Sequence, residues 1–146
     1  MNILVSACLL GVNCKYNGKN NYNQNVLDFI DGHTVIKICP ELLGGLGVPR
    51  DSIEMVDGIF VTKNGKNVDA QLRMGVALSM EEVRKHNIDL AILQSRSPTC
   101  GVKEIYDGTF QGVLIKGSGL FAKSLQDEGI LTKDCQDFDP SRKKGR

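Results

Sequence analysis

The segment LAILQSRSPTCG, residues 90–101, gives the clearest indication of fold in this 146-residue chain. It opens with Leu90–Leu93, an uninterrupted apolar run of the kind found in strands that are covered on both faces of a parallel sheet. The chain then turns at Pro98 and presents the thiol of Cys100 just before Gly101. The segment therefore predicts a buried strand whose carboxyl end carries a reactive side chain.

Further apolar runs at 2–5 and 34–38 predict two more strands of this kind. Helical patterns alternate with the strands. Apolar residues recur every three or four positions over 68–86, and shorter helices are predicted at 24–31 and 118–129. This alternation indicates an α/β fold with a mainly parallel sheet flanked by helices, a Rossmann-like arrangement with right-handed connections.

Smaller features complete the predicted organisation. Ser118 is the predicted N-cap of the last helix, a hairpin is expected at 53–62, and a further strand is expected near 113–115. The length of the chain suits one domain with a real hydrophobic core. We expect this single domain to span 1–135, followed by a polar and basic tail at 136–146.

The charge of the chain does not favour nucleic acid or a membrane as a partner. The chain carries 18 basic and 17 acidic residues, a net charge of +1, so no overall field favours nucleic acid or a membrane surface. The basic cluster at 142–146 is interpreted as a solvated terminus rather than an RNA site. No stretch approaches the roughly 20 apolar residues that span a bilayer.

We also expect the protein to be cytoplasmic, because the apolar run at 3–5 has neither a basic leader nor a small-residue cleavage site. This expectation bears on the five cysteines of the chain. Disulfides rarely persist in a reducing compartment, so cysteines there are inert core thiols, catalytic groups or metal ligands.

Three cysteines directly follow predicted strands: Cys8, Cys39 and Cys100. If the strands are parallel, all three thiols leave the sheet at its carboxyl edge, which is where open α/β sheets bind their ligands. Cys14 lies six residues after Cys8 and could reach the same place, whereas Cys135 stands without companions near the C-terminus. The sequence therefore predicts a ligand site at the carboxyl ends of the strands.

The spacing of these thiols limits what they could hold. Structural zinc sites use C-x2-4-C pairs, and the chain contains no such pair. Isolated cysteines on separate strands suit an iron–sulfur cluster better, and three thiolates would leave one iron open to substrate. The thiols could equally be buried side chains that pack as small hydrophobic groups. Spacing alone favours neither interpretation.

Beyond spacing, the sequence resembles the thiouracil desulfurase family over about residues 3 to 133. The resemblance lies in short motifs that occur in the family's order: Cys8-Leu9-Leu10-Gly11, Cys14-Lys15-Tyr16-Asn17-Gly18, Cys39-Pro40-Glu41, Gly44-Gly45-Leu46, Pro49-Arg50, Ser97-Pro98-Thr99-Cys100-Gly101 and Tyr106-Asp107-Gly108-Thr109-Phe110. Lys15, Asn17 and Thr99 stand where other residues are commoner in the family, which leaves the precise substrate open.

The resemblance implies an activity and a cofactor. It implies a [4Fe-4S] cluster held by Cys8, Cys39 and Cys100, with Cys14 as the residue whose exclusion is least secure. It also implies removal of sulfur from a small thiolated pyrimidine without net redox, which releases sulfide and the oxo-pyrimidine. Another class of function is a non-catalytic protein that binds a metal or an iron–sulfur cluster. An enzyme acting on thiolated RNA is disfavoured by the near-neutral charge and the few aromatic residues.

The resemblance further implies that Glu41 and Ser97 act on substrate. Glu41 could move protons to an attacking water and to the pyrimidine, although its position also suits a surface or capping carboxylate. Ser97 could hydrogen-bond the base or the water, and it could equally cap the turn at Pro98. Arg50 is expected either to pair with an acidic residue or to contact the ligand.

Overall fold

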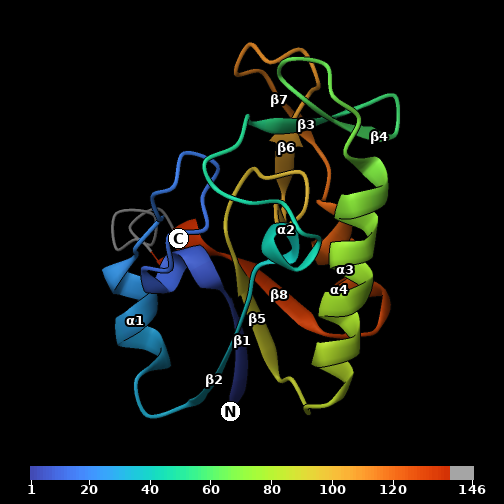
Figure 1. Ribbon diagram of the computed structural model, residues 1–146. Coiled ribbons are helices and arrows are strands. Elements are labelled where there is room, and N and C mark those ends of the chain that lie inside the picture. The colour runs from blue at the N-terminus through green and yellow to red at the C-terminus, as the bar shows by residue number, and fades with distance from the viewer. Residues whose placement is uncertain (139–146) are drawn as a thin grey trace.

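Four parallel strands form the central sheet, and they all end at the same edge (Figure 1). The computed structural model describes residues 1–138. The sheet has the order β2-β1-β5-β8, with β1 at Asn2–Ser6, β2 at Thr34–Ile38, β5 at Leu90–Leu93 and β8 at Leu131–Asp134. The α/β fold and the first three of these strands are therefore confirmed. The fourth strand, β8, was not predicted, because its sequence LTKD is mostly polar and lies at the edge of the sheet.

Helices cover both faces of the sheet, because successive strand residues point to opposite sides. On one face, Ile3 and Ile92 pack with Val26 of α1 (Gln24–Ile30) and with two short 3-10 helices, η1 (Ala7–Leu10) and η2 (Cys135–Phe138). On the other face, Leu4 and Leu93 pack against α3 (Asp69–Arg84) and α4 (Leu120–Asp127).

The N-cap predicted for the last helix was wrong. Gly119, not Ser118, is the N-cap of α4. The hydroxyl of Ser118 instead donates a hydrogen bond to the carbonyl of Val102, at 3.0 Å. A loop contact therefore uses the side chain that the sequence pattern assigned to the helix.

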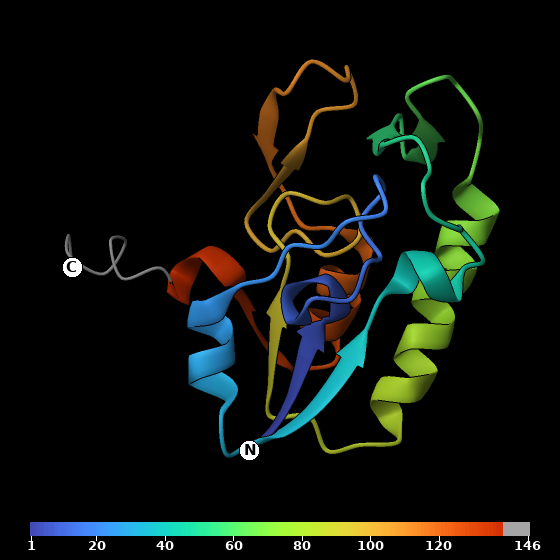
Figure 2. The ribbon, with the colours of Figure 1, turned by 60° about the vertical axis from the view of Figure 1, so that its left-hand side comes forward.

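Two antiparallel hairpins stand beyond the carboxyl edge of the sheet (Figure 2). The predicted hairpin consists of β3 (Ile53–Val56) and β4 (Ile59–Thr62), and its turn residues Asp57 and Gly58 both have positive φ. The other consists of β6 (Glu104–Tyr106) and β7 (Leu114–Lys116). The strand expected near 113–115 is thus real, but it pairs in a hairpin of its own and not in the central sheet.

A short helix, α2 (Pro40–Leu43), follows β2 and packs very closely against α3. A Cβ atom added to Gly75 of α3 would lie 2.0 Å from the carbonyl oxygen of Pro40. One added to Gly44 would lie 2.3 Å from the carbonyl oxygen of Gln71. The two backbones can approach this closely because both positions are glycine.

At the C-terminal end, the packed structure continues through η2 to Phe138. The ring of Phe138 is buried and packs against the ring of Phe29 in α1, with 4.8 Å between their centroids. The basic cluster at 142–146, predicted to be a solvated terminus, lies outside the described residues. Among residues 1–138, no helix combines the length and the apolar character that a membrane crossing needs.

Candidate active site

A cavity of about 540 Å³ lies at the carboxyl ends of β1, β2 and β5, beneath the two hairpins. Its floor comes from the loops that follow these strands, and its upper wall includes residues of the hairpins. The cavity therefore occupies the edge of the sheet where the sequence predicts a ligand site.

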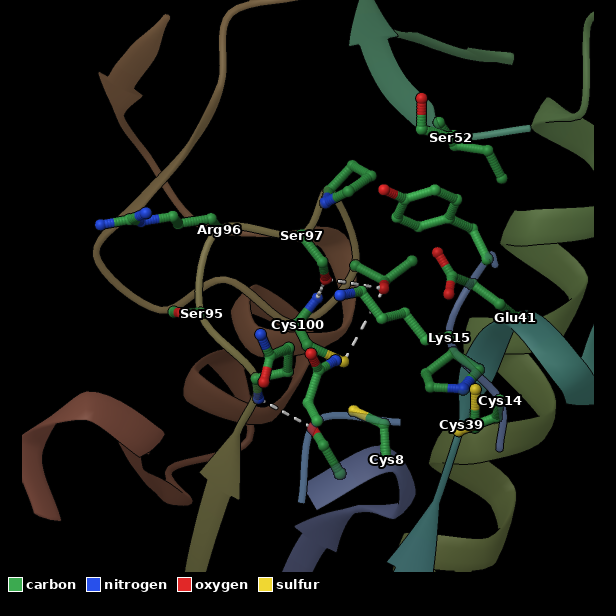
Figure 3. A pocket seen from close by; sticks show the side chains of 18 of the residues that line it. Cys8, Cys14, Lys15, Cys39, Glu41, Ser52, Ser95, Arg96, Ser97 and Cys100 are labelled. Carbon is green, nitrogen blue, oxygen red and sulfur yellow. Dashed lines mark hydrogen bonds between the residues drawn. The ribbon is translucent and has the colours of Figure 1, made fainter. Parts of the chain in front are cut away.

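Four thiols line this cavity (Figure 3). Cys8 lies in η1 after β1, Cys39 lies between β2 and α2, and Cys100 lies in the loop after β5. The structure thus brings together the three predicted ligands, and it adds Cys14 to the same cavity. Cys135 is not in this group, since it is buried in the adjacent core with its thiol 3.7 Å from Oε1 of Gln94.

The thiols influence one another's ionisation. A hydrogen bond from Cys14 lowers the pKa of Cys8, and another lowers the pKa of Cys39 to about 7 despite the opposing effect of burial. The same two hydrogen bonds, together with burial, raise the pKa of Cys14. The three thiols of Cys8, Cys14 and Cys39 therefore lie close enough to interact directly.

Cys100 lies in the rigid turn after β5. Its backbone N–H donates a 2.7 Å hydrogen bond to Oγ of Ser97, and the hydroxyl of Thr99 lies 3.7 Å from its sulfur. Burial raises the pKa of this thiol to about 12, with hydrogen bonds from Ser6 and Thr99 acting in the opposite direction. Binding of iron at Cys100 would therefore have to displace a proton.

Ser97 both caps this turn and lines the cavity. Its oxygen accepts the N–H of Cys100, which is the capping contact that the sequence left as one possibility. Its hydroxyl also lies 3.1 Å from the hydroxyl of Thr99. Because Thr99 donates its own proton to the sulfur of Cys100, the hydroxyl of Ser97 is the donor in this contact, and a ligand would have to compete with Thr99 for its proton.

Glu41 and Arg50 form a partly buried ion pair beside the thiols. Nη2 of Arg50 lies 2.6 Å from Oε2 of Glu41, and the two side chains are only 10% and 19% exposed. Burial raises the pKa of Glu41, and the charge of Arg50 opposes this shift. Arg50 also donates to the carbonyl of Cys14 at 3.0 Å. Of the two roles expected for Arg50, pairing with an acidic residue is therefore observed.

Residues without an assigned role in the sequence complete the wall. They include Lys15, Arg96, Tyr106, Phe110 and the buried carboxylate Glu54. Tyr106 and Phe110 lie in a motif that carried the family resemblance, so a signal for them was present. Nothing in the pattern of β3 identifies Glu54, because a lone carboxylate in a strand usually faces solvent.

The donors in the cavity fit an iron–sulfur cluster better than a single ion. No group of three or more His, Cys, Asp or Glu side chains among residues 1–138 closes around one metal ion. In an iron–sulfur cluster each thiolate binds a different iron, so the sulfurs stay well apart. The gathered side chains are thiols, which are the ligands that such clusters take.

The sheet and its cavity define an α/β protein that binds its ligand at the carboxyl edge of parallel strands. The chain belongs to the 2-thiouracil desulfurase family, whose model matches residues 3–137. The resemblance inferred from the motifs is therefore confirmed.

Two similar proteins extend this result. The uncharacterized protein YbbK of Bacillus subtilis (strain 168) is 36% identical over 137 residues, which cover 87% of this chain and 91% of YbbK. A solved structure of the [4Fe-4S]-dependent thiouracil desulfidase TudS superposes with a TM-score of 0.86 at 35% identity. That match covers 96% of this chain and 93% of TudS, so the two proteins share the whole fold.

Proposed function

We propose that this protein is an iron–sulfur-dependent enzyme that removes sulfur from a thiolated pyrimidine. The reaction exchanges C=S and water for C=O and sulfide, so no net redox change is needed. The observation that carries the proposal is the cavity itself, where thiols from three strand ends surround a space beside a partly buried carboxylate. The shared fold with a thiouracil desulfidase supports it.

Cys8, Cys39 and Cys100 are the proposed ligands of a [4Fe-4S] cluster, one from the end of each of β1, β2 and β5. When bound, such a cluster supplies an open iron that is a soft Lewis-acid partner for a thiocarbonyl sulfur. We assign Cys14 a supporting role, because it lines the same cavity beside Cys8 and Cys39 but does not follow the end of a strand.

Glu41 is proposed to move protons. Arg50 binds Oε2, so Oε1 is the atom left to take a proton from water and return one to the departing sulfur or the ring. Burial raises the pKa of Glu41, which brings it closer to the range where a carboxylate can both accept and donate. Ser97 is proposed to turn its hydroxyl proton from Thr99 to the substrate or to the attacking water when a ligand enters the cavity.

The proposed substrate is a small molecule, a thiouracil-like base or nucleoside, rather than nucleic acid. The cavity is large enough for such a ligand, and the net charge of +1 offers no electrostatic attraction for a polyanion. We also propose a cytoplasmic location, because the five cysteines are free and an iron–sulfur site requires reduced thiols.

The experiment is reconstitution of the cluster under anoxia, followed by incubation with 2-thiouracil or 4-thiouracil. We expect release of sulfide in step with formation of uracil, and loss of the cluster's visible absorption in Cys8→Ser, Cys39→Ser and Cys100→Ser. Cys135→Ser is the matched control and should keep the cluster, since Cys135 lies outside the cavity. A protein that holds a cluster but releases no sulfide would instead be a cluster-binding protein.

A further inference from the structure

Glu54 of β3 is a buried carboxylate that the proposed reaction does not use. Its residue is only 7% exposed, and it lines the same cavity as the thiols. No ion pair joins it to a lysine or arginine within the described part of the chain. Its Oε1 instead accepts two backbone N–H groups, from Gly108 at 2.9 Å and from Phe110 at 3.1 Å.

Both donors belong to the loop between β6 and β7, residues 107–113, which we call the Phe110 loop. The loop lies directly against β3, because a Cβ atom on Gly108 would be 2.5 Å from the carbonyl oxygen of Met55. Glu54 therefore fastens one hairpin to the other across the top of the cavity. A carboxylate that accepts backbone N–H groups forms stronger hydrogen bonds than a neutral acceptor does.

Phe110 is held in an unfavourable conformation at this point. Its φ is +58°, in the left-handed region that non-glycine residues seldom adopt. The N–H of the same residue is one of the two that Glu54 binds. Strain of this kind persists only where surrounding contacts enforce it, and it is concentrated at ligand sites.

The strained residue supplies an aromatic side chain to the cavity wall, together with Tyr106. Planar unsaturated bases bind well to aromatic faces. We propose that Phe110 stacks on the base of the bound substrate, and that Glu54 is the positioning residue that holds the Phe110 loop in place for this contact. This inference rests on the proposed function and adds a specificity-determining wall to it.

Two readouts test the inference. Hydrogen–deuterium exchange of the peptide that covers residues 106–113 reports the loop in the absence of substrate. Steady-state kinetics with 4-thiouracil at equal cluster content report the stacking contact. Sulfide release by the loaded wild type tests the proposed function separately. A failure of the proposed function can therefore be distinguished from a failure of Glu54 to hold the Phe110 loop, which hydrogen–deuterium exchange reports.

Glu54→Ala should speed exchange in the Phe110 loop and raise KM about tenfold, while kcat and cluster content stay close to wild type. Glu54→Gln keeps an oxygen acceptor and should restore both slow exchange and a low KM. Glu81→Ala is the control, because Glu81 is an exposed carboxylate on α3.

Phe110→Leu should raise KM by a similar factor and leave loop exchange slow, because Glu54 binds the backbone rather than the ring. The KM of the double variant should not exceed the higher of the two single-variant KM values, since both changes remove the same contact with the substrate. Unchanged loop exchange in Glu54→Ala would overturn the fastening. The role of Glu54 and Phe110 in substrate binding would be overturned by any of three results. These are faster loop exchange with an unchanged KM in Glu54→Ala, fully additive increases in KM in the double variant, or a loaded wild type that releases no sulfide.

Discussion

At the scale of single residues, the contact between Arg50 and Glu41 sets how readily the carboxylate exchanges a proton. Arg50 opposes the rise in pKa that burial imposes on Glu41. Arg50→Met should therefore raise that pKa further, and the acidic limb of the profile of kcat/KM against pH should move to higher pH. A carboxylate that acts first as a base loses activity below its pKa, which fixes the direction of the shift.

Arg50→Lys is the matched variant, because it keeps the positive charge and should move the limb less. The profiles are compared at equal cluster content, since Arg50 also holds the backbone of Cys14. An acidic limb that stays in place in Arg50→Met would remove Arg50 from control of the proton transfer.

A second prediction at this scale concerns Ser97, whose oxygen caps the turn and which also lines the cavity. Ser97→Ala should lower the free energy of unfolding by about 1 kcal/mol and also reduce turnover. Ser97→Asn supplies another oxygen that can accept the N–H of Cys100, so it should recover stability without recovering turnover. Thermal unfolding and kinetics on the two variants distinguish the roles. Full activity in Ser97→Ala would leave the residue with the cap alone.

At the scale of elements, the packing of α2 on α3 positions half of the site, because Cys39 and Glu41 lie at the start of α2. Gly75→Ala should be destabilising by roughly 1–3 kcal/mol, although alanine usually stabilises a helix relative to glycine. The steric effect wins because the added methyl group would meet the backbone of Pro40 and Gly44, which cannot rotate away.

The same displacement of α2 should lower the amount of cluster that the protein retains after reconstitution. Met74→Ala is the control, since its side chain is exposed on the neighbouring position of α3. Denaturant unfolding and iron content measure the two effects. A more stable Gly75→Ala variant would contradict the close approach of the two helices.

At the scale of the whole molecule, the proposed cluster would join the ends of three strands that are far apart in sequence. Ligands that bind the folded chain stabilise it by mass action. Removal of the cluster by an iron chelator under anoxia should therefore lower Tm by about 5–10 °C. Scanning calorimetry of loaded and stripped protein measures this shift. Identical melting curves would mean that the cluster does not bridge the strands.

Much of this architecture could be predicted because a parallel sheet imposes its own geometry. Once β1, β2 and β5 are recognised as parallel, Cys8, Cys39 and Cys100 must leave at one edge. The strand β8 escaped prediction because an edge strand can be polar, and three of its four residues, LTKD, are polar or charged. The ion pair of Arg50 with Glu41 was only one possibility in the sequence, because the turn that joins them follows no helical or strand period.

The contact of Glu54 with the Phe110 loop could not be predicted at all. Its two hydrogen bonds span 54 and 56 positions of the sequence and join two different hairpins. Such a contact depends on how the hairpins dock, and no local pattern encodes that arrangement. Cys14 was expected only as a residue that could reach the same site, because it approaches the thiols through an irregular loop whose path the sequence does not specify.

The hairpins belong to sheets of their own and stand apart from the hydrogen-bonded ladder of the central sheet. The proposed donors to iron and the proposed substrate wall are therefore carried by separate structural modules. Substitutions in β3, β4, β6 or β7 could alter which thio-compound is accepted while the ligand geometry is inherited unchanged. The fold thus allows substrate preference to diversify during evolution, or in a designed library confined to the hairpins, without re-optimising the metallocentre.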